Sequence, residues 1–580
     1  MPAYQLPVLQ KNTDELLRQL EAEIKECTEV RSPYANKVKK FMIANGIWHL
    51  NELDYFWRVK YEEFLKDEVK PVSCSTYIKA FDRMKQHTIC GKAHLSGKKK
   101  YNRPAYRNQI LFLLYHPEPE IFKKFDNTVK KQDLLWNFSV QASETLKKQI
   151  FQILHHIIEN VNDTWWRRMY LMALKQFYRY CVEMEFNTIE WLEQNQIDQF
   201  KKSSYGQNIY REFDIVNYAQ KVLFTEAEKI PWNANVWYME RIHLQEERIN
   251  PSDPVDTISF LEIVNGENRK LAKQYVKYNL GLTDLSLSSI KQEFIYIRRF
   301  LVSLPPDINV DSLSREQAER VLYQFGNREI KEKSYNRILD AIVHFFQFLK
   351  VRNYISEIPF QQEYYRKKEI LQHHDRSVEK SVTAQIVSNL YRFPEQIRLI
   401  YLHLWTLGLR ISEVCTLKGN AYYIWGKDTW IQVYQIKSRT YKRIPIPNAL
   451  YRIMKVYLSR YQIRRDEYVF KNTRGGAFCG DTFIYNMKRY CKICGIGNGE
   501  YVFRSHDYRH GVATQFYDSE VPLQSIRDYL GHEYEEMTLQ YVDYMPRRAD
   551  NANEEFFKNT ENNLAECLRK ESANEQSDLF

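Results

Sequence analysis

Apolar residues recur at helical spacing in three separate stretches of this 580-residue chain, and this pattern constrains its fold more than any other feature. In the stretches at about 16–90, 137–229 and 271–360, apolar side chains at positions i, i+3 and i+4 form the stripe that an amphipathic helix buries. The chain is too long for one ordinary hydrophobic core, because domains usually contain roughly 100–200 residues. Likeness among the three stretches leaves internal duplication and unrelated helical bundles both open. The sequence therefore predicts a mainly α-helical protein with several domains.

A different pattern begins near residue 375. Helical segments continue through EQIRLIYLHLWTLGLRISEVCTL, but TWIQVYQIKS and YKRIPIP alternate apolar and polar residues as half-buried strands do. This mixture predicts an α+β domain with a small antiparallel sheet. Turn-rich stretches mark the boundaries farther upstream. The predicted domains are an N-terminal helical domain at 1–110, a second helical domain at 111–230, a connector at 231–270, a third helical domain at 271–362, the α+β domain at 375–550, and a C-terminal tail or docking segment at 551–580.

Charge and composition narrow the class of protein. The formal net charge of +11 favours a polyanionic partner, although a merely basic soluble protein has the same charge. The N-terminus lacks the order of a secretory signal, and no stretch approaches the roughly 20 apolar residues of a membrane span. Cys491 and Cys494 form a CxxC with no second ligand pair nearby. We expect a cytoplasmic protein with no membrane segment and no bound metal.

Short motifs in the last third of the chain concentrate cationic side chains. GLRISEVCTL places Arg410 directly after a glycine and a leucine, with Glu413 one helical turn later. SHDYRHGVATQFY carries His506, Arg509 and His510, whose offsets of three and four residues put them on one face of a helix. Taken singly, each residue has an ordinary structural explanation. Their combination is what points to chemistry.

A final motif adds a histidine and a tyrosine. LGH supplies His532, and Tyr541 follows nine residues later. Together with the arginines, these groups suit an attack on a phosphodiester without a metal, because paired guanidiniums can clamp the charge that the transition state gathers on its non-bridging oxygens. A tyrosine, with an ordinary pKa of about 10, must lose a proton as it attacks, and the leaving 5′ oxygen must gain one. His506, His532 and a lysine are the candidates for these proton transfers.

The order of these motifs, with a lysine on the hairpin between them, resembles the tyrosine recombinase (phage integrase) family. The resemblance covers residues 375–550, and residues 271–362 look like the family's core-binding domain, a SAM-like helical DNA-binding domain. The long N-terminal extension is similar to that of transposon-encoded members. The resemblance implies catalytic roles for Arg410, Lys437, His506, Arg509, His532 and Tyr541, with Glu413 and His510 in support.

The hairpin lysine has two candidates. Lys437 stands eight residues before Pro445, which matches the proline that ends the family's second strand, so Lys437 is the first choice. Lys442 is the alternative. The chain departs from the family's pattern at Tyr508, where leucine is usual, and in the hairpin, where KSRTYKR replaces a Gly-rich turn. Neither departure removes a functional group from the site.

The resemblance implies an enzyme that breaks and rejoins DNA strands without a metal, a cofactor or ATP. Tyr541 would attack the scissile phosphate to form a 3′-phosphotyrosyl link, with Tyr544 as the alternative nucleophile. Lys437 would protonate the leaving oxygen, His506 would assist the tyrosine, and His532 would hydrogen-bond the phosphate. The implied partners are double-stranded DNA at specific recombination sites, other copies of the chain in a homotetramer, and accessory recombination proteins.

The implied outcome of this chemistry is the integration, excision or transposition of a mobile element. Two other functions stay open on the sequence. A type IB-like topoisomerase uses similar side chains to relax supercoils, and a non-catalytic DNA-binding protein could retain a decayed site. Against the second, buried cationic residues are costly without a phosphate to meet.

Overall fold

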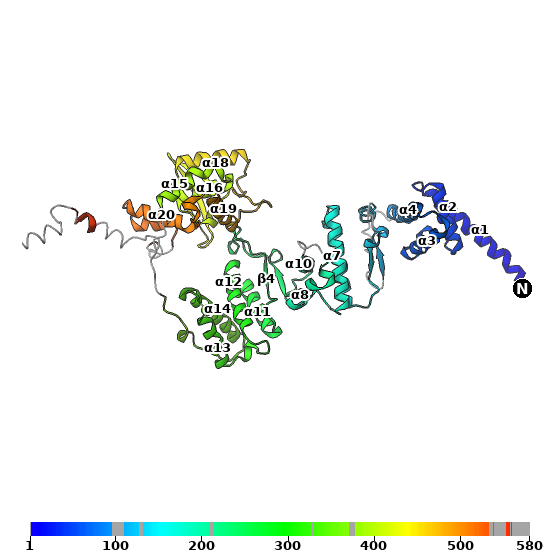
Figure 1. Cartoon of the computed structure of the whole chain (residues 1–580), viewed down its shortest axis with the longest axis horizontal. Coiled ribbons are helices and arrows are strands. Elements are labelled where there is room, and N and C mark those ends of the chain that lie inside the picture. The colour runs from blue at the N-terminus through cyan, green and yellow to red at the C-terminus, as the bar shows by residue number, and fades with distance from the viewer. Residues whose placement is uncertain are drawn as a thin grey trace, which may run out of the picture. The chain divides into compact units, whose positions relative to one another are not determined.

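The computed structural model describes residues 2–95, 109–126, 131–207, 214–327, 329–369, 378–532, 538, 553–556 and 558 (Figure 1). The chain divides into two compact units. The first unit comprises residues 1–241 with 259–264, and the second comprises 242–258 with 265–580. The six-domain division made from the sequence is finer than these two units and stays a prediction.

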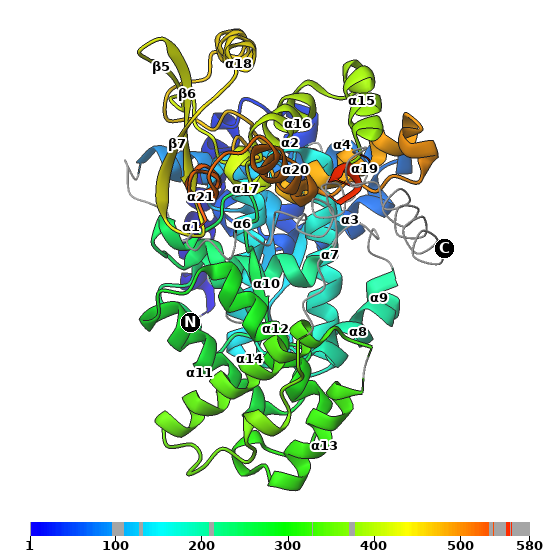
Figure 2. The ribbon, with the colours of Figure 1, turned by 90° about the vertical axis from the view of Figure 1, so that its left-hand side faces the viewer.

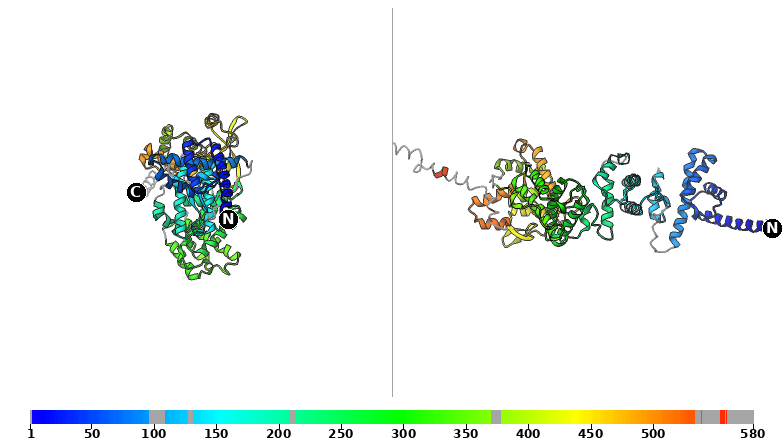
Figure 3. Two further views of the ribbon diagram at one scale, coloured as in Figure 1. Left: turned by 90° about the vertical axis from the view of Figure 1, so that its right-hand side faces the viewer. Right: turned by 90° about the horizontal axis from the view of Figure 1, so that it is seen from below.

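The first unit begins with a helical module. Its elements are α1 (Pro2–Glu26), α2 (Ser32–Ala44), η1 (Leu50–Glu52), α3 (Tyr55–Glu68) and α4 (Pro71–Leu95), with α1 visible as one long helix in Figure 3. Asp54 caps α3 by accepting a hydrogen bond from the backbone N–H of Trp57 at 3.0 Å. The rings of Phe41, Tyr61 and Phe81 pack together in its core.

A second, larger core follows in the same unit. Its elements are β1 (Ile110–Phe112), η2 (Leu113–Tyr115), α5 (Pro119–Lys123), η3 (Lys131–Leu134), β2 (Leu135–Asn137), α6 (Glu144–Asn160), α7 (Thr164–Glu183), α8 (Gln194–Lys202), α9 (Ser204–Gln207) and α10 (Ile215–Glu226). Three of the helices begin with a side-chain cap, since Ser143, Asp163 and Asp214 cap α6, α7 and α10. The antiparallel pair of β1 and β2 is a correction to the sequence analysis, which expected only helices here.

A buried ion pair joins the helical module to the segment that follows it. Arg58 of α3 donates to the carboxylate of Asp82 of α4 at 2.8 Å, and both residues are buried. Tyr115 of η2 donates its hydroxyl to the same carboxylate at 2.6 Å. A buried carboxylate needs such partners, because it has lost the water that would otherwise solvate its charge.

The second unit contains a four-helix block and the α+β region. The helices of the block are α11 (Gly266–Leu282), α12 (Leu287–Ser303), α13 (Arg315–Gly326) and α14 (Glu332–Val351), with the short turns η6 (Val310–Ser312) and η7 (Gln362–Tyr364). Asn265, Ser286 and Ser314 cap the first three helices. These bounds agree with the helical periodicity read in this stretch of sequence.

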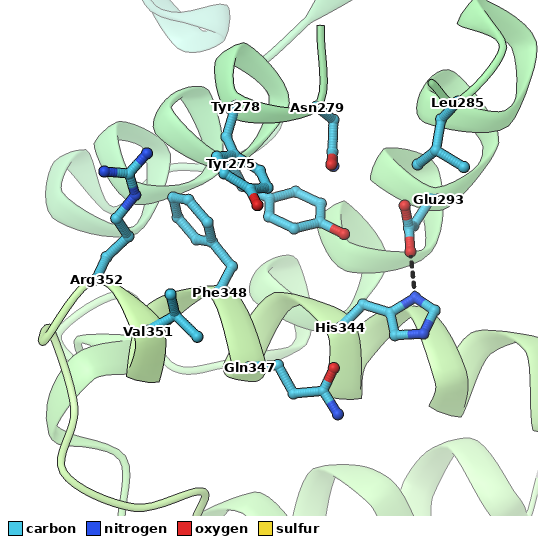
Figure 4. Close-up of a pocket in the computed structure, with 10 residues that line it drawn as sticks. All are labelled: Tyr275, Tyr278, Asn279, Leu285, Glu293, His344, Gln347, Phe348, Val351 and Arg352. Atoms are coloured by element: carbon cyan, nitrogen blue, oxygen red, sulfur yellow. Dashed lines mark hydrogen bonds and ion pairs between the residues drawn. The ribbon is translucent and has the colours of Figure 1, made fainter. Parts of the chain in front are cut away.

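A cavity of about 300 Å³ lies among α11, α12 and α14 (Figure 4). Tyr275, Tyr278 and Phe348 line it with aromatic rings. Across it, His344 of α14 meets the carboxylate of Glu293 of α12 at 2.7 Å, and this hydrogen bond raises the pKa of His344. The pair therefore links the two helices while leaving the cavity between them.

The predicted connector at 231–270 is not a plain linker. It contains β3 (Val236–Tyr238), η4 (Met239–Arg241), η5 (Glu246–Arg248) and β4 (Thr257–Ser259), and residues 242–258 pack with the second unit. The buried guanidinium of Arg248 donates to the backbone carbonyls of Asn279 and Leu280, each at 2.9 Å. Because the last carbonyls of a helix have no partner within it, Arg248 caps the C-terminal end of α11.

The α+β region confirms the predicted small antiparallel sheet. Its elements are α15 (Lys380–Asn389), η8 (Leu390–Arg392), α16 (Glu395–Leu407), α17 (Ile411–Cys415), β5 (Tyr422–Trp425), β6 (Asp428–Gln435), β7 (Thr440–Pro445), α18 (Asn448–Arg460), α19 (Gly480–Ile493), η9 (Ile496–Gly499), α20 (Ser505–Asp518) and α21 (Leu523–Leu530). The sheet has the order β5-β6-β7, and Figure 2 shows its strands side by side. In the register, Ile431 faces Ile444 and Val433 faces Lys442, so Lys442 belongs to the buried face.

Among the residues that the structure describes, no helix combines the length and apolar character needed to cross a bilayer. Within the same residues, no cluster of His, Cys, Asp or Glu side chains is placed to hold a metal ion. Cys491, the first cysteine of the CxxC motif, is buried in α19. Most of the predicted tail at 551–580 lies outside the described residues.

The Arg58–Asp82 pair makes a testable contribution to stability. Replacing Arg58 by methionine removes the cation and leaves the Asp82 carboxylate buried, so we expect a loss of about 3–5 kcal/mol in the unfolding free energy. The exposed pair of Lys201 and Asp214 is the matched control, and Lys201→Met should cost at most about 1 kcal/mol. Calorimetry of the full chain measures both, and equal effects of the two substitutions would contradict the structural role given to the buried pair.

Candidate active site

Arg410 stands at a sharp junction between two helices. α16 ends at Gly408, which has a φ of +61°, and a Cβ at this position would lie 3.0 Å from the Cβ of Val512. Arg410 is the N-cap of α17, and Glu413 at the third helical position accepts a hydrogen bond from its backbone N–H at 3.0 Å. The glycine, arginine and glutamate of GLRISE together form the turn that ends α16 and begins α17.

The carboxylate of Glu413 is the centre of the cluster. Its side chain is 1% exposed, and it accepts a hydrogen bond from the guanidinium of Arg410 at 2.9 Å. The ammonium of Lys442 lies 3.4 Å from its other oxygen. Burial alone would raise the pKa of Glu413, but the charges of Lys442, Arg509 and Arg410 lower it below its ordinary value. Glu413 is therefore ionised at neutral pH although it is buried.

Arg509 joins the junction before α17 to the end of α21. It lies on α20 and is 1% exposed. Its guanidinium donates to the carbonyl of Gly408 at 3.0 Å and to the carbonyl of Leu530 at 2.6 Å. The same Nη2 lies 2.9 Å from Nε2 of His532. The second arginine predicted from the sequence is thus held in a fixed place by backbone and ring acceptors.

His532 is buried and carries no charge at neutral pH. Burial, followed by the charges of Arg509, Arg410 and Lys442, lowers its pKa to about 3. A guanidinium can only donate, so Nε2 of His532 must accept from Arg509, and the ring proton must sit on Nδ1. Nδ1 lies 2.9 Å from the hydroxyl of Thr538, which accepts that proton.

His506 and His510 lie one turn apart on α20, as the sequence analysis expected. Their ring centroids are 6.3 Å apart. His510 is buried, whereas His506 is exposed. Partial burial and the nearby charges of Arg509, His510 and Arg410 lower the pKa of His506 to about 4. His506 is therefore neutral at physiological pH and able to accept a proton.

The two candidate lysines occupy different environments. Lys437 lies in the turn between β6 and β7 and is exposed, and burial of its stem together with the charge of Arg410 lowers its pKa. Lys442 lies on the buried face of β7, where burial lowers its pKa to about 8. Its ammonium donates to the carbonyl of Leu530 at 3.1 Å. The fallback lysine is thus embedded in the cluster, and the preferred one stands at its rim.

The described part of the cluster carries an excess of positive charge. The charged members are Arg410, Lys437, Lys442 and Arg509 on the positive side and Glu413 on the negative side. Such a site attracts a phosphate group and can stabilise negative charge that develops on it. Tyr541, the predicted nucleophile, and its alternative Tyr544 lie outside the described residues.

The buried state of His532 predicts a dependence of stability on pH. Its folded pKa of about 3 lies below the unfolded value of 6.5, so the unfolded chain takes up a proton first as the pH falls. Stability is therefore full above about pH 6.5 and falls below it, by up to about 1.4 kcal/mol for each pH unit. His532→Asn, which does not titrate, should flatten this slope in calorimetry of the full chain. His403 and His506, whose pKa values are also lowered, contribute equally to the wild type and to the variant, so identical slopes for the two would refute the assignment.

Comparisons with known proteins find similarity to one family. Residues 376–548 match the model of the phage integrase family. Transposase B from transposon Tn554 of Staphylococcus aureus strain Mu50 is 26% identical over 359 residues, which cover 60% of this chain and 57% of the relative. The chain therefore spans little more than half the length of that relative. Tyrosine recombinase XerA of Thermococcus onnurineus is 26% identical over 269 residues, which cover 45% of this chain and 86% of the relative.

Solved structures overlap with the chain more loosely. The integrase of transposon Tn1549 in complex with a circular intermediate DNA covers 49% of this chain, with a TM-score of 0.39 and 14% identity, and 98% of the integrase chain is matched. A lambda integrase dimer bound to a core site covers 48% of this chain and 77% of its own, with a TM-score of 0.39 and 16% identity. The family model and the sequence relatives thus agree that residues 376–548 of the chain are similar to the phage integrase family, the tyrosine recombinases.

Proposed function

We propose that the chain is a site-specific DNA recombinase that cleaves and rejoins DNA strands through a 3′-phosphotyrosyl intermediate on Tyr541. The observation that carries this proposal is the buried cluster in which Glu413 holds Arg410 beside Arg509. Two fixed guanidiniums can clamp a scissile phosphate, because each offers planar donors to the non-bridging oxygens. The sequence supplies the tyrosine nine residues after His532.

The chemistry is two successive transesterifications. The phenol oxygen of Tyr541 forms a bond to phosphorus, and the bond from phosphorus to the 5′ oxygen breaks. His506, which is neutral at physiological pH because its pKa is lowered to about 4, takes the phenol proton, and Lys437 at the exposed rim gives a proton to the leaving oxygen. The 5′-hydroxyl of a partner strand then attacks the phosphotyrosine and releases Tyr541. Since each step exchanges one phosphate ester for another, no ATP is required, and the charge stabilisation that a metal ion could supply comes from Arg410 and Arg509.

In the protein without DNA, His532 contributes to the site by accepting a hydrogen bond from Arg509. Both of its ring nitrogens are engaged, one by Arg509 and the other by Thr538. A direct hydrogen bond from His532 to the phosphate therefore requires the ring to exchange one of these partners when DNA binds. His510 and Glu413 support the site from buried positions.

We place this chemistry on double-stranded DNA at specific recombination sites, in the cytoplasm, with four copies of the chain and accessory recombination proteins. The domain at 271–362 would serve as the core-binding domain, and the domain at 375–550 as the catalytic domain. The helical domains at 1–110 and 111–230 would add DNA-binding or assembly surfaces. The name of the Tn554 relative, a transposase, supports transposition of a mobile element as the outcome.

Tyr541→Phe should abolish covalent attachment to DNA while leaving binding intact, because it removes one oxygen and nothing else. The assay mixes the full chain with nicked suicide duplexes cut from the DNA that flanks its gene, and denaturing gels separate the adduct. Tyr544→Phe is the matched control and should form the adduct normally. An adduct that persists in Tyr541→Phe and disappears in Tyr544→Phe would transfer the role of nucleophile to Tyr544.

The same protein distinguishes recombination from relaxation. A recombinase should attach covalently only to duplexes that carry its site and should leave a supercoiled plasmid without that site unchanged. Relaxation of such a plasmid at a comparable rate, dependent on Tyr541, would indicate a type IB-like topoisomerase instead. Tight binding of several duplexes without any adduct would indicate a non-catalytic DNA-binding protein.

A further inference from the structure

Two polar side chains of the β6–β7 hairpin contact the C-terminal end of α21, which lies far downstream in the sequence. Lys442 of β7 donates to the carbonyl of Leu530 at 3.1 Å, across 88 positions of sequence. Gln435, the last residue of β6, donates to the carbonyl of Gly531 at 3.2 Å, across 96 positions. Both side chains are buried. These contacts fix the C-terminal end of α21 against the sheet.

The end of α21 is a place where side-chain donors are needed. The last carbonyls of a helix lack partners within the helix and carry partial negative charge. Leu530 accepts from Lys442 and also from Arg509, at 2.6 Å. Gly531 has a φ of +70°, and a Cβ there would lie 2.0 Å from Nε2 of Gln435. Glycine is therefore favoured here for two reasons: it adopts the left-handed backbone conformation without strain, and it has no Cβ to clash with Gln435.

The residue that follows this anchored end is His532. Its position relative to Arg509 therefore depends on where α21 ends. The amide of Gln435 is itself held, because its Oε1 accepts from the hydroxyl of Thr440 at 3.5 Å. The chain after His532 leads to Tyr541, so the same anchor sets the origin of the segment that carries the tyrosine.

Lys442 also contacts the other half of the site. Its ammonium lies 3.4 Å from the Glu413 carboxylate, which holds Arg410. An ammonium has three N–H donors, and those of Lys442 are directed to a buried carboxylate and a buried carbonyl. Its side chain is 7% exposed. Lys437, on the same hairpin, is exposed and has no comparable enclosure.

We propose that Lys442 and Gln435 are positioning residues, which anchor the end of α21 and thereby set the place of His532, while Lys437 keeps the proton-donor role proposed for it above. This inference rests on the proposed recombinase function. It adds Gln435, which the motif comparison did not assign to the site, and it gives Lys442, the alternative proton donor, a positioning role instead.

The anchor is tested without DNA by amide hydrogen exchange in the full chain. Lys442→Met and Gln435→Leu keep the size of the side chains and remove the donors, so exchange of amides in residues 523–532 should rise by about 10-fold. Lys437→Met, a matched loss of a lysine from the same hairpin, should leave these amides unchanged. Unchanged exchange in both Lys442→Met and Gln435→Leu would overturn the anchor.

The roles of the two lysines are tested with two forms of the suicide duplex. In one form the bridging 5′ oxygen at the scissile phosphate is replaced by sulfur. A thiol has a pKa of about 8.5 and leaves as the thiolate, so cleavage of this bond needs no proton donor. Loss of a proton donor is therefore rescued by sulfur, and loss of a positioning residue is not.

We expect Lys437→Met to form the covalent adduct slowly with the oxygen duplex and at the wild-type rate with the sulfur duplex. Lys442→Met should be slower by about 100-fold with both, because a displacement of about 1 Å has an effect of that size. Lys442→Arg, which keeps the charge, should recover part of the rate. Rescue of Lys442→Met by sulfur would overturn the proposal and make Lys442 the proton donor.

The two measurements separate the possible failures. If Lys442→Met unfolds, Gln435→Leu carries both tests, since it removes a neutral group and leaves the Glu413 cluster complete. Wild-type protein that forms no Tyr541-dependent adduct with either duplex would refute the proposed function. In that case the exchange experiment still decides whether the hairpin anchors α21.

Discussion

The carboxylate of Glu413 is the interaction on which the rest of the site depends. Burying a carboxylate costs several kcal/mol unless charges and hydrogen bonds replace the lost water. Here the replacement comes from Arg410 and Lys442, with Arg509 close enough that its charge also lowers the Glu413 pKa. The same carboxylate permits the cations to be buried. Because these cations come from the start of α17, from β7 and from α20, one ionised group holds separate elements of the α+β region together.

This arrangement divides the cluster by exposure. Arg509, Lys442, Glu413 and His532 are buried and contact one another or backbone carbonyls. Lys437 and His506 lie at the exposed rim beside them, and partial desolvation together with the neighbouring cations lowers the pKa of each. The buried groups hold the geometry, and the exposed groups remain available to exchange protons with a substrate. A phosphate that enters the site meets an excess of positive charge that folding has already fixed in place, which is the condition for electrostatic stabilisation of a transition state.

Much of this was predictable from the sequence, for physical reasons that differ between residues. Helical periodicity predicted α20, and with it the shared placement of His506 and Arg509, because the i, i+3 relation is local. The sequence analysis read the segment around Gly408 as helical throughout and missed the break between α16 and α17, although the three-residue spacing of Arg410 and Glu413 is itself local. Lys442 was visible in part, since strict alternation along β7 puts it on the same face as Ile444, but the motif comparison favoured Lys437.

The contacts that the sequence did not reveal are those with partners far along the chain. Arg509 and Lys442 donate to the carbonyl of Leu530, and Gln435 donates to that of Gly531. The sequence could not indicate these contacts, because every residue type has a backbone carbonyl. The short pair of β1 and β2 was missed because three-residue strands give too few residues for a period of two to be recognised.

The most direct test of the account is to identify the residue that becomes linked to DNA. The full chain is trapped on a nicked duplex, digested with trypsin and nuclease, and analysed by fragment-ion mass spectrometry. The account predicts a nucleotide on Tyr541, within the peptide that begins after Arg527 and ends at Arg547. A nucleotide on any other residue, Tyr544 of the same peptide included, would mean that the cluster around Glu413 does not serve a tyrosine nine residues after His532, and the central claim would be wrong.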